Sequence, residues 1–362
     1  MTVRVNKQPF NIREKLSELE RPIGIKGHEL MGAETVQEAR DIVSAGRKNA
    51  LYNGDMRIWQ RGTLFPNGGG GAVVNYTADR WNSTRYASSE NDVSREDANH
   101  LGFRYCLRSA RGGGDTATTA RYVSQVLEQK DTWKLRGNYV TFSFYLRVGS
   151  GFNGGKVFSS ITYHTDSSRE ERFHYDQFQN GNNTRSKIPH ESVSENWKRY
   201  THTTYIPDNA QQVGVAISSN ENLPNAVSAD YFEMTGCQLE VGRNATDFEH
   251  RSYGEELALC QRYCQSFNGR IAIGNWNGAT GALVVRYLSP PMRIAPSMHS
   301  YTSGRCLVEA VAWYNVGSVA IQSETRNTSA VFQLSSVSNS GQSVNANAMW
   351  GNGASVVLQA EL

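Results

Sequence analysis

Strict alternation of apolar and polar residues is the feature of this sequence that most limits its fold. Val140, Phe142, Phe144 and Leu146 alternate with polar or amphipathic residues, and residues 101–107 repeat the pattern. A period of two puts one set of side chains on one face of a strand. Further strand-like runs follow at 156–163, 199–206, 212–218 and 229–239, and turn-forming stretches lie at 67–71, 111–114, 149–155 and 180–183. Many short strands with frequent turns predict a mainly β protein built as a sandwich or barrel, not as parallel α/β units.

The composition agrees with this class and excludes several functions. The 362 residues include 33 Gly, 9 Pro and 17 Tyr, a mixture of turn formers and strand formers. A net charge of +3 and the lack of a run of basic residues do not indicate a surface that binds nucleic acid. No stretch approaches the roughly 18 apolar residues of a membrane span, so we expect no membrane insertion. The N-terminus lacks a signal peptide's apolar stretch, and we expect the chain to fold in the compartment where it is made.

Residues 1–50 differ from the rest and form the first of four predicted segments. They are polar, and Thr35-Val-Gln-Glu38 has the spacing of a helix capping box. The apolar residues behind it are too few to make a core; they are Val36, Ala39, Ile42 and Val43. Such a segment is either a flexible leader or is ordered by a partner, and two helix signals favour the partner. We therefore predict an extended docking segment with short helices.

The other segments are a β-sandwich at 51–243, a linker with a helix at 244–268 and a C-terminal β module at 269–362. In the linker, Ser252-Tyr-Gly-Glu255 is a second capping box. Behind it Leu257, Cys260, Cys264 and Phe267 fall on one helical stripe, which predicts a helix of roughly 15 residues ending near Gly269. The five cysteines are scattered, and we interpret Cys260 and Cys264 as core packing.

The region from Asn53 to about Val241 resembles the jelly-roll carbohydrate-binding modules of the galactose-binding-like type. The resemblance rests on fragments that occur in the family's order. These fragments are Asn53-Gly-Asp55, Trp133–Gly137 before Tyr139–Arg147, Trp197–Tyr200 before Thr203–Pro207, and Asp230–Glu240. It implies a central jelly-roll sandwich in which Trp133 and Trp197 are core residues.

A closer resemblance is to the tail-fibre and related virion proteins of bacteriophages, over roughly residues 28–298. It rests on five fragments, at 40–49, 53–63, 78–81, 236–251 and 256–263. The sequence departs from that pattern at Met56, where Phe is common, and at Asp247, where Pro is common.

This second resemblance implies a structural virion protein without enzymatic activity, assembled in the bacterial host cytoplasm. Such a protein would be a tail fibre or spike that binds host-surface polysaccharide, docks on tail or other virion proteins through its N-terminal segment, and forms a homotrimer. Two alternatives remain open at this stage: a head-decorating fibre or other structural virion component, and a polysaccharide depolymerase.

Candidate glycan-binding residues lie in the C-terminal module. A sugar ring stacks on an exposed aromatic face that has amide or carboxylate neighbours. Trp276 stands between Asn275 and Asn277, and Trp350 lies in a similar turn-like stretch, which predicts exposed rings. Trp313-Tyr314 is a third candidate; the alternative for all of them is packing between sheets or subunits.

Catalytic and metal sites have weaker signals. Asp166, Glu170, Glu171 and Asp176 lie near His164 and His174, but they are mixed with arginines as in a solvated hairpin. Glu255-Glu256 begins a helix, where carboxylates favour the dipole. We therefore assign no catalytic residue. Asp55 and Asp230 are carboxylates that a structural calcium ion could use, but no calcium-loop signature surrounds them, and no cofactor is assigned.

Overall fold

The computed structural model describes most of the chain from residue 48 onward. The described residues are 48–66, 73–85, 91–111, 120–152, 156–180, 183–219, 229–278, 281–302, 304–308, 312–337, 347–351 and 353–361. The chain divides into two units, Met1–Lys48 and Asn49–Leu362. The predicted docking segment, with Val36, Ala39, Ile42 and Val43, lies outside the described residues.

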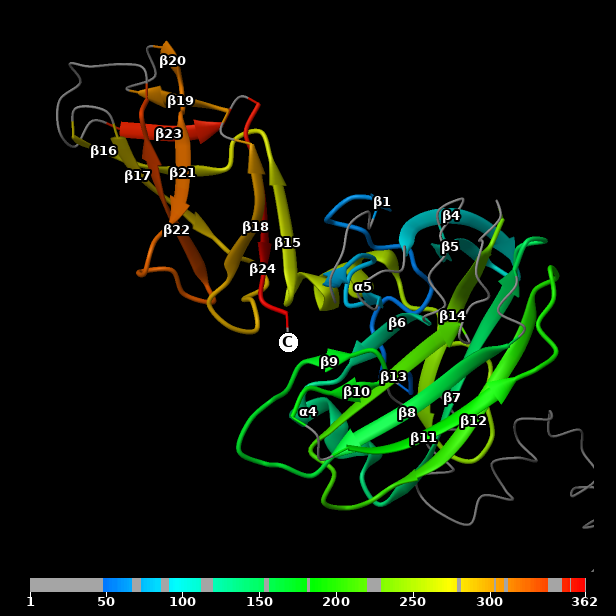
Figure 1. Cartoon of the computed structure of the whole chain (residues 1–362). Helices are drawn as coiled ribbons and strands as arrows, with labels where there is room; N and C mark the ends of the chain where they lie inside the picture. The colour runs from blue at the N-terminus through cyan, green and yellow to red at the C-terminus, as the bar shows by residue number, and fades with distance from the viewer. Residues whose placement is uncertain are drawn as a thin grey trace, which may run out of the picture. The chain divides into compact units, whose positions relative to one another are not determined.

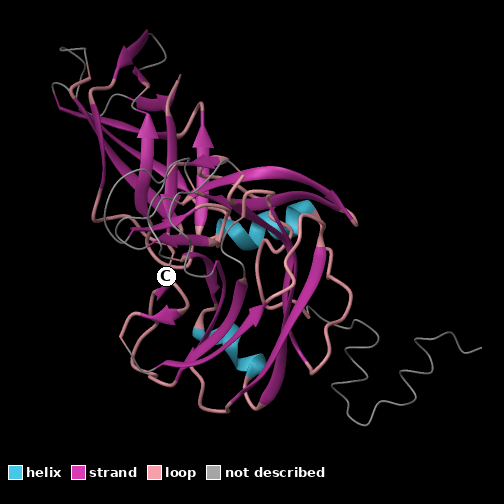
Figure 2. Ribbon diagram, turned by 45° about the vertical axis from the view of Figure 1, so that its right-hand side comes forward, coloured by secondary structure: helices cyan, strands magenta, loops and turns pink. Residues whose placement is uncertain are grey.

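Two antiparallel sheets form the first module of the second unit, which we call the sandwich module (residues 49–243; Figures 1 and 2). The first sheet has the order β1 (Leu64–Phe65), β4 (Asp92–His100), β5 (Phe103–Ala110), β14 (Tyr231–Val241), β7 (Asn138–Val148) and β12 (Lys198–Ile206). The second has the order β11 (Asn183–His190), β8 (Val157–His164), β13 (Gln212–Ser219), β6 (Arg121–Val126), β3 (Asn82–Arg85) and β2 (Val73–Tyr76).

The core of this module lies between the two sheets and confirms the predicted alternation. On β7, Val140, Phe142, Phe144 and Leu146 are buried in one apolar cluster. The facing sheet contributes its own inward residues, among them Ile161, Val215 and Ile217. Burying these side chains supplies the main stabilising free energy of the module.

The outer face of the second sheet has its own cover. A two-stranded ladder, β9 (Phe173–His174) with β10 (Gln177–Phe178), places Phe173 and Phe178 against Val126 and Ala216. Gly214 lies beneath it, and a Cβ atom there would meet the Phe173 ring at 2.6 Å. A short helix, α4 (Gln129–Thr132), and the 3-10 turn η1 (Trp133–Leu135) follow β6, and Leu135 enters the core.

The linker helix is shorter than the sequence predicts. Helix α5 covers Tyr253–Gln261, and the Ser252 hydroxyl accepts a hydrogen bond from the Glu255 amide, as the capping box predicts. The prediction that the helix continues through Cys264 and Phe267 is wrong. Cys264–Asn268 is strand β15, because it pairs with β24 (Ser355–Gln359) near the far end of the chain.

The C-terminal module (residues 264–361) is a second set of antiparallel sheets around a second core. A three-stranded sheet has the order β15, β24 and β18 (Ser297–Thr302). The larger sheet has the order β20 (Ala312–Asn315), β19 (Arg305–Val308), β23 (Asn347–Gly351), β16 (Ala272–Gly278), β17 (Gly281–Tyr287), β22 (Ser329–Ser335) and β21 (Ser318–Ile321). Cys260, Cys264 and the other three cysteines are buried thiols, which agrees with their interpretation as packing residues.

Buried charges tie the end of the chain to the start of the sandwich module. The Glu361 carboxylate is paired with Arg61 at 3.0 Å and with Arg80, and its side chain is only 5% exposed. The Arg80 guanidinium also lies 3.7 Å from the centre of the Tyr263 ring. Among the described residues, no helix is long and apolar enough to cross a membrane.

Candidate functional site

Two of the three tryptophans predicted to stack on sugar are core residues. Trp276 and Trp350 are both fully buried in the core of the C-terminal module, and Trp350 packs against Phe332. Trp276 pairs with Ala282 on β17, and Trp350 pairs with Ala272 on β16 and with Cys306 on β19. Both indoles therefore point inward from the larger sheet. The prediction that these rings form an exposed binding surface is wrong.

The structure describes the side chains of two of the other predicted residues of the module, Asn275 and Tyr314. Asn275 is exposed on the outward face of β16, and Tyr314 is half-buried against the core. The side chains of Asn277 and Trp313 lie outside the described set.

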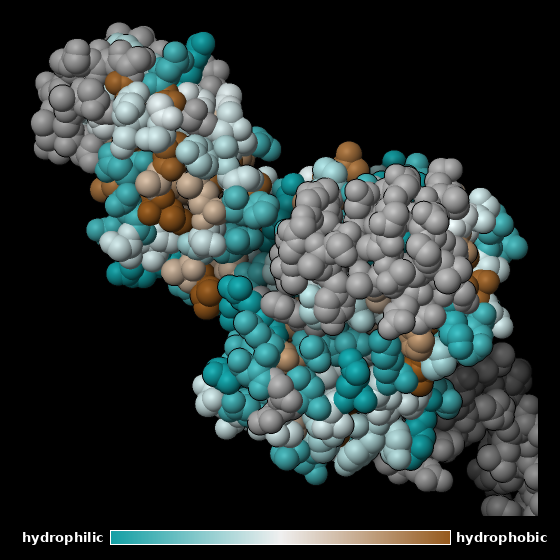
Figure 3. Space-filling model, in the orientation of Figure 1, coloured by the Kyte–Doolittle hydropathy of each residue, from teal (hydrophilic) through white to brown (hydrophobic). Residues whose placement is uncertain are grey.

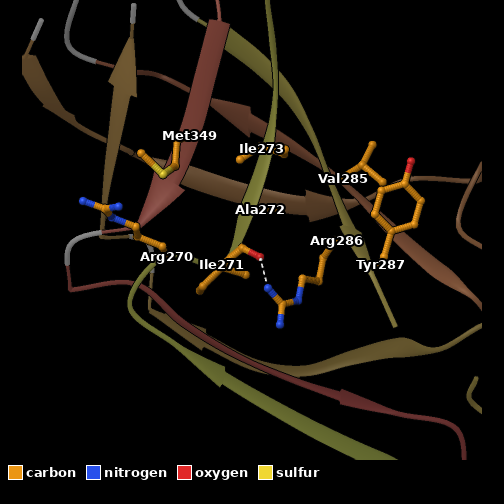
Figure 4. Close-up of a pocket in the computed structure, with 8 residues that line it drawn as sticks. All are labelled: Arg270, Ile271, Ala272, Ile273, Val285, Arg286, Tyr287 and Met349. Carbon is orange, nitrogen blue, oxygen red and sulfur yellow. Dashed lines mark hydrogen bonds between the residues drawn. The ribbon is translucent and has the colours of Figure 1, made fainter. Parts of the chain in front are cut away.

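The C-terminal module does carry an apolar hollow on its outer sheet face, and Figure 3 shows hydrophobic residues gathered on this module. Met349, Ile273, Val285 and Val331 lie in register across β23, β16, β17 and β22. Figure 4 shows three of them around the hollow, with Tyr287 at one side and Arg286 donating to the Ile271 carbonyl at 3.3 Å. Ile273 and Tyr287 are 66% and 78% exposed. This lining offers few polar groups for sugar hydroxyls.

A more polar face lies on the first sheet of the sandwich module, along its edge strand β12 (Figure 1). The outward side chains of this strand and the residue before it are Trp197, Arg199, Thr201, Thr203 and Tyr205, which we call the β12 row. Their alternates, such as Tyr200 and Ile206, enter the core. Eight residue steps of about 3.3 Å separate the two aromatic ends by roughly 26 Å. The row is therefore an open, elongated ledge.

Residues 242–246, which cross the first sheet after β14, lie along the inner side of the β12 row. Thr203 donates its hydroxyl to the Arg243 carbonyl at 3.3 Å, and Thr141 donates to the Gly242 carbonyl at 2.8 Å. Further along the row, the Arg199 guanidinium donates to the Thr246 carbonyl and to the Ser143 hydroxyl. These contacts hold residues 242–246 against β7 and β12 without covering the row.

At one end of the row, two tyrosines lie on neighbouring strands. Tyr205 pairs with Tyr139 on β7, their ring centres are 5.3 Å apart, and they are 44% and 38% exposed. The Arg243 guanidinium lies 3.4 Å from the centre of the Tyr139 ring, within the range of a cation–π contact. Tyr205 is the ring of this pair with a face available to a ligand.

Two tryptophans interpreted from the jelly-roll resemblance as core residues lie elsewhere. Trp133, on η1, is 67% exposed, and it is Leu135 that enters the core. Trp197 is half-buried on the outer face of the first sheet, stacked on His100 with 5.7 Å between ring centres. The prediction that Trp133 is a core residue is therefore wrong. Trp197 does not enter the main core either; it packs, half-buried, on a small cluster outside the first sheet.

The carboxylates considered for catalysis are held by neighbouring cations or backbone amides. Asp176 is buried and paired with Arg185 and Lys187. Glu170 binds Arg293, and Glu171 is paired with Arg169.

Glu256, at the start of α5, is 4% exposed. It accepts a hydrogen bond from the Asn53 amide at 2.6 Å and lies 3.4 Å from Arg251. Burial raises the pKa of this carboxyl. Through these contacts Glu256 links the turn at Asn53 to helix α5.

Asp55 and Asp230 are each paired with arginine. Asp55 lies 2.8 Å from Arg57, and the two oxygens of Asp230 lie 3.0 Å from Arg111 and 3.1 Å from Arg121. Among the described residues, no group of three His, Cys, Asp or Glu side chains is arranged to hold a metal ion. The carboxylates of Asp55 and Asp230 are thus used in ion pairs with arginines.

The β12 row was missed at the sequence level, although a signal for it exists. In Trp197–Ile206 the residues Tyr200, His202 and Ile206 fall on one face of a period of two. The other face then collects Trp197, Arg199 and Tyr205, with threonines between them. A strand with an apolar inner face and this outer set is typical of an exposed functional face.

No known family model matches this chain, and no curated protein matches it significantly. Solved structures with a distant likeness include the enzymatically active domain of tailspike protein 4 of bacteriophage CBA120. That domain is 13% identical, with a TM-score of 0.31, over 54% of this chain and 21% of that chain.

Two further likenesses are to proteins of Clostridium thermocellum. The N-terminal endo-1,4-β-D-xylanase 10B, solved as CBM22-1-GH10 modules with xylohexaose, is 9% identical, with a TM-score of 0.33 over 55% of this chain and 29% of that chain. The C-terminal family 22 carbohydrate-binding module of Xyn10B is 13% identical, with a TM-score of 0.31 over 51% of this chain and 100% of the module. This chain thus spans less than a third of the tailspike and xylanase chains. At these identities and TM-scores, function has to be argued from the residues of this chain.

Proposed function

We propose that this chain is a non-catalytic glycan-binding protein of a bacteriophage particle, a tail fibre or spike, and that a glycan lies along the β12 row. The fragments at 53–63 and 236–251, which resemble tail-fibre proteins, support the virion part. The glycan part rests on the sandwich module, since Trp276 and Trp350, two of the rings predicted to bind sugar in the C-terminal module, are buried.

The single observation that carries the proposal is the make-up of the β12 row. Tyr205 offers a half-exposed ring at one end, and Trp197 offers part of an indole at the other. Exposed threonines lie between them, with the Arg199 guanidinium. Aromatic faces take the apolar faces of sugar rings, and hydroxyl and guanidinium groups bond to sugar oxygens. The open length of roughly 26 Å suits an extended polymer better than a small ligand.

The assembly follows the same proposal. A homotrimer would present three such rows, and several weak contacts made together bind far more tightly than one. The N-terminal segment would dock on the particle. Three chains of 40.2 kDa give about 121 kDa, which light scattering on the purified protein measures directly; a monomer of 40.2 kDa would refute the trimer.

The glycan part is tested by binding of the full chain to immobilised bacterial capsular and cell-surface polysaccharides. Tyr205→Ala is expected to weaken binding about three- to tenfold, the value of one aromatic stacking contact. Tyr205→Phe keeps the ring and is expected to bind like the wild type. The matched control is Tyr287→Ala, which removes a ring 78% exposed on the C-terminal module.

Two results would count against the proposal. If Tyr205→Ala binds as well as the wild type while Tyr287→Ala does not, the glycan lies on the C-terminal module. If the wild type releases reducing ends from a bound polysaccharide, the protein is a depolymerase and not a passive binder.

A further inference from the structure

We infer that the glycan held on the β12 row is anionic and carries carboxylate groups along its repeating unit. The inference rests on the proposed function and specifies its ligand. The observation behind it is the distribution of charge on the outer face of the first sheet.

Three arginines on this face lie against its aromatic rings. The guanidinium carbons of Arg147, Arg199 and Arg243 lie 4.8, 5.8 and 3.4 Å from the ring centres of Trp197, Tyr145 and Tyr139. A guanidinium that contacts an aromatic ring can still donate its remaining N–H groups to a planar anion.

Two of these arginines have no carboxylate partner among the described residues. Arg199 donates to a threonine carbonyl and a serine hydroxyl, both neutral, and Arg243 rests on Tyr139 and is exposed. Arg147 differs, because it pairs with the buried Glu233, which Arg108 also binds at 2.6 Å. The uncompensated positive charge therefore lies at Arg199 and Arg243, along the row itself.

Two acidic groups of this face, Glu233 and Glu240, are buried and already bound. Glu240 is 2% exposed and accepts hydrogen bonds from the Thr246 amide at 2.9 Å and from Gln238 at 2.8 Å. Asp247 is exposed, but it lies beyond Thr246 on the crossing segment, and the row itself contains no acid. A row of donors without carboxylates favours a ligand rich in acceptors, and an acidic polysaccharide supplies them at every repeat.

An extended glycan fits this face better than a nucleic acid does. Consecutive bases need a run of neighbouring stacking rings with many phosphate contacts. Here the two ends of the row are roughly 26 Å apart, and threonines fill the space between them.

The test uses the full chain and acidic polysaccharides from the binding panel, each before and after chemical reduction of its carboxyl groups to alcohols. The wild type is expected to bind the acidic forms and to lose at least tenfold on the reduced forms. Arg243→Gln should weaken binding about two- to fivefold, an effect that added salt reduces. Arg305→Gln removes an exposed cation of the C-terminal module as the matched control and should bind like the wild type.

The outcomes separate the inference from the proposed function. Equal binding to intact and reduced forms, with Tyr205→Ala still defective, leaves the glycan site standing and overturns the anionic ligand. Binding to no polysaccharide in the panel counts against both. Binding of polyuridylate or duplex DNA as tight as that of the acidic glycan, and equally sensitive to Arg243→Gln, overturns the inference in favour of a nucleic acid.

Discussion

Two histidines enclosed at the edge of the sandwich module should make its stability depend on pH. His202, on β12, is only 2% exposed. Its Nδ1 lies 3.1 Å from the Ser159 hydroxyl and its Nε2 lies 2.8 Å from the Ser186 hydroxyl. The Ser159 hydroxyl also meets His190 Nε2 at 2.9 Å. Burial lowers the pKa of both imidazoles to about 4, from an ordinary value of 6.5.

The direction and size of the effect follow from proton linkage. In the unfolded chain His202 titrates at its ordinary pKa, so below pH 6.5 the unfolded state binds the proton that the folded state excludes. Stability is therefore full above about pH 7 and falls as the pH drops toward 4. Between pH 7 and pH 5 the free energy of unfolding should fall by about 2 kcal/mol for His202 alone. His190 acts in the same direction.

The assay is urea unfolding of the full chain, followed by fluorescence at pH 7, 6 and 5. We compare the wild type with His202→Gln, which has no imidazole at this position. Its loss of unfolding free energy between pH 7 and pH 5 should be smaller by about 2 kcal/mol. Tyr200→Phe is the control, because it removes a buried hydroxyl bonded to the Ser192 carbonyl and should cost the same at each pH. Identical pH slopes for the wild type and His202→Gln would refute the buried, neutral imidazole.

Two further substitutions test the packing that positions the ledge and joins the modules. Gly214→Ala puts a methyl group 2.6 Å from the Phe173 ring and should lower the free energy of unfolding in urea by about 1–3 kcal/mol. Adding Phe173→Leu to this variant should recover part of the loss. If the losses of the two substitutions simply add, the clash is contradicted. Glu361→Gln leaves Arg80 buried without its anion and leaves Arg61 with only Asp79, 3.8 Å away. The loss should be roughly 3–5 kcal/mol, seen as faster hydrogen exchange in β15 and β24. Unchanged exchange there would show that this ion pair does not hold the modules.

The fold class could be predicted because a period of two is a local property of the sequence. The alternation in Val140–Leu146 predicts which side chains face the core, whatever the partner strand is, and the structure confirms that prediction. The extent of helix α5 could not be predicted in the same way. Cys264 and Phe267 suit a helical stripe, but β24 lies about 90 residues later and draws them into a sheet, so a distant pairing overrides local periodicity.

The exposure of tryptophans was harder still, since it depends on which face of a sheet is covered. Asn275 and Asn277 beside Trp276 indicate a turn, yet the indole faces Ala282 and the second core. Trp133 and Leu135 lie on the same 3-10 turn, Trp133–Leu135, and the turn places Leu135, not Trp133, in the core. Neither outcome is encoded in the composition around the residue.

The most direct test of the account is a crystal structure of the full chain with an oligosaccharide cut from its tightest-binding polysaccharide. We predict sugar rings over Thr201 and Thr203, one of them on Tyr205, and an acidic group within hydrogen-bond distance of Arg199 or Arg243. Sugar bound in the hollow beside Ile273 and Tyr287, with the β12 row empty, would contradict it.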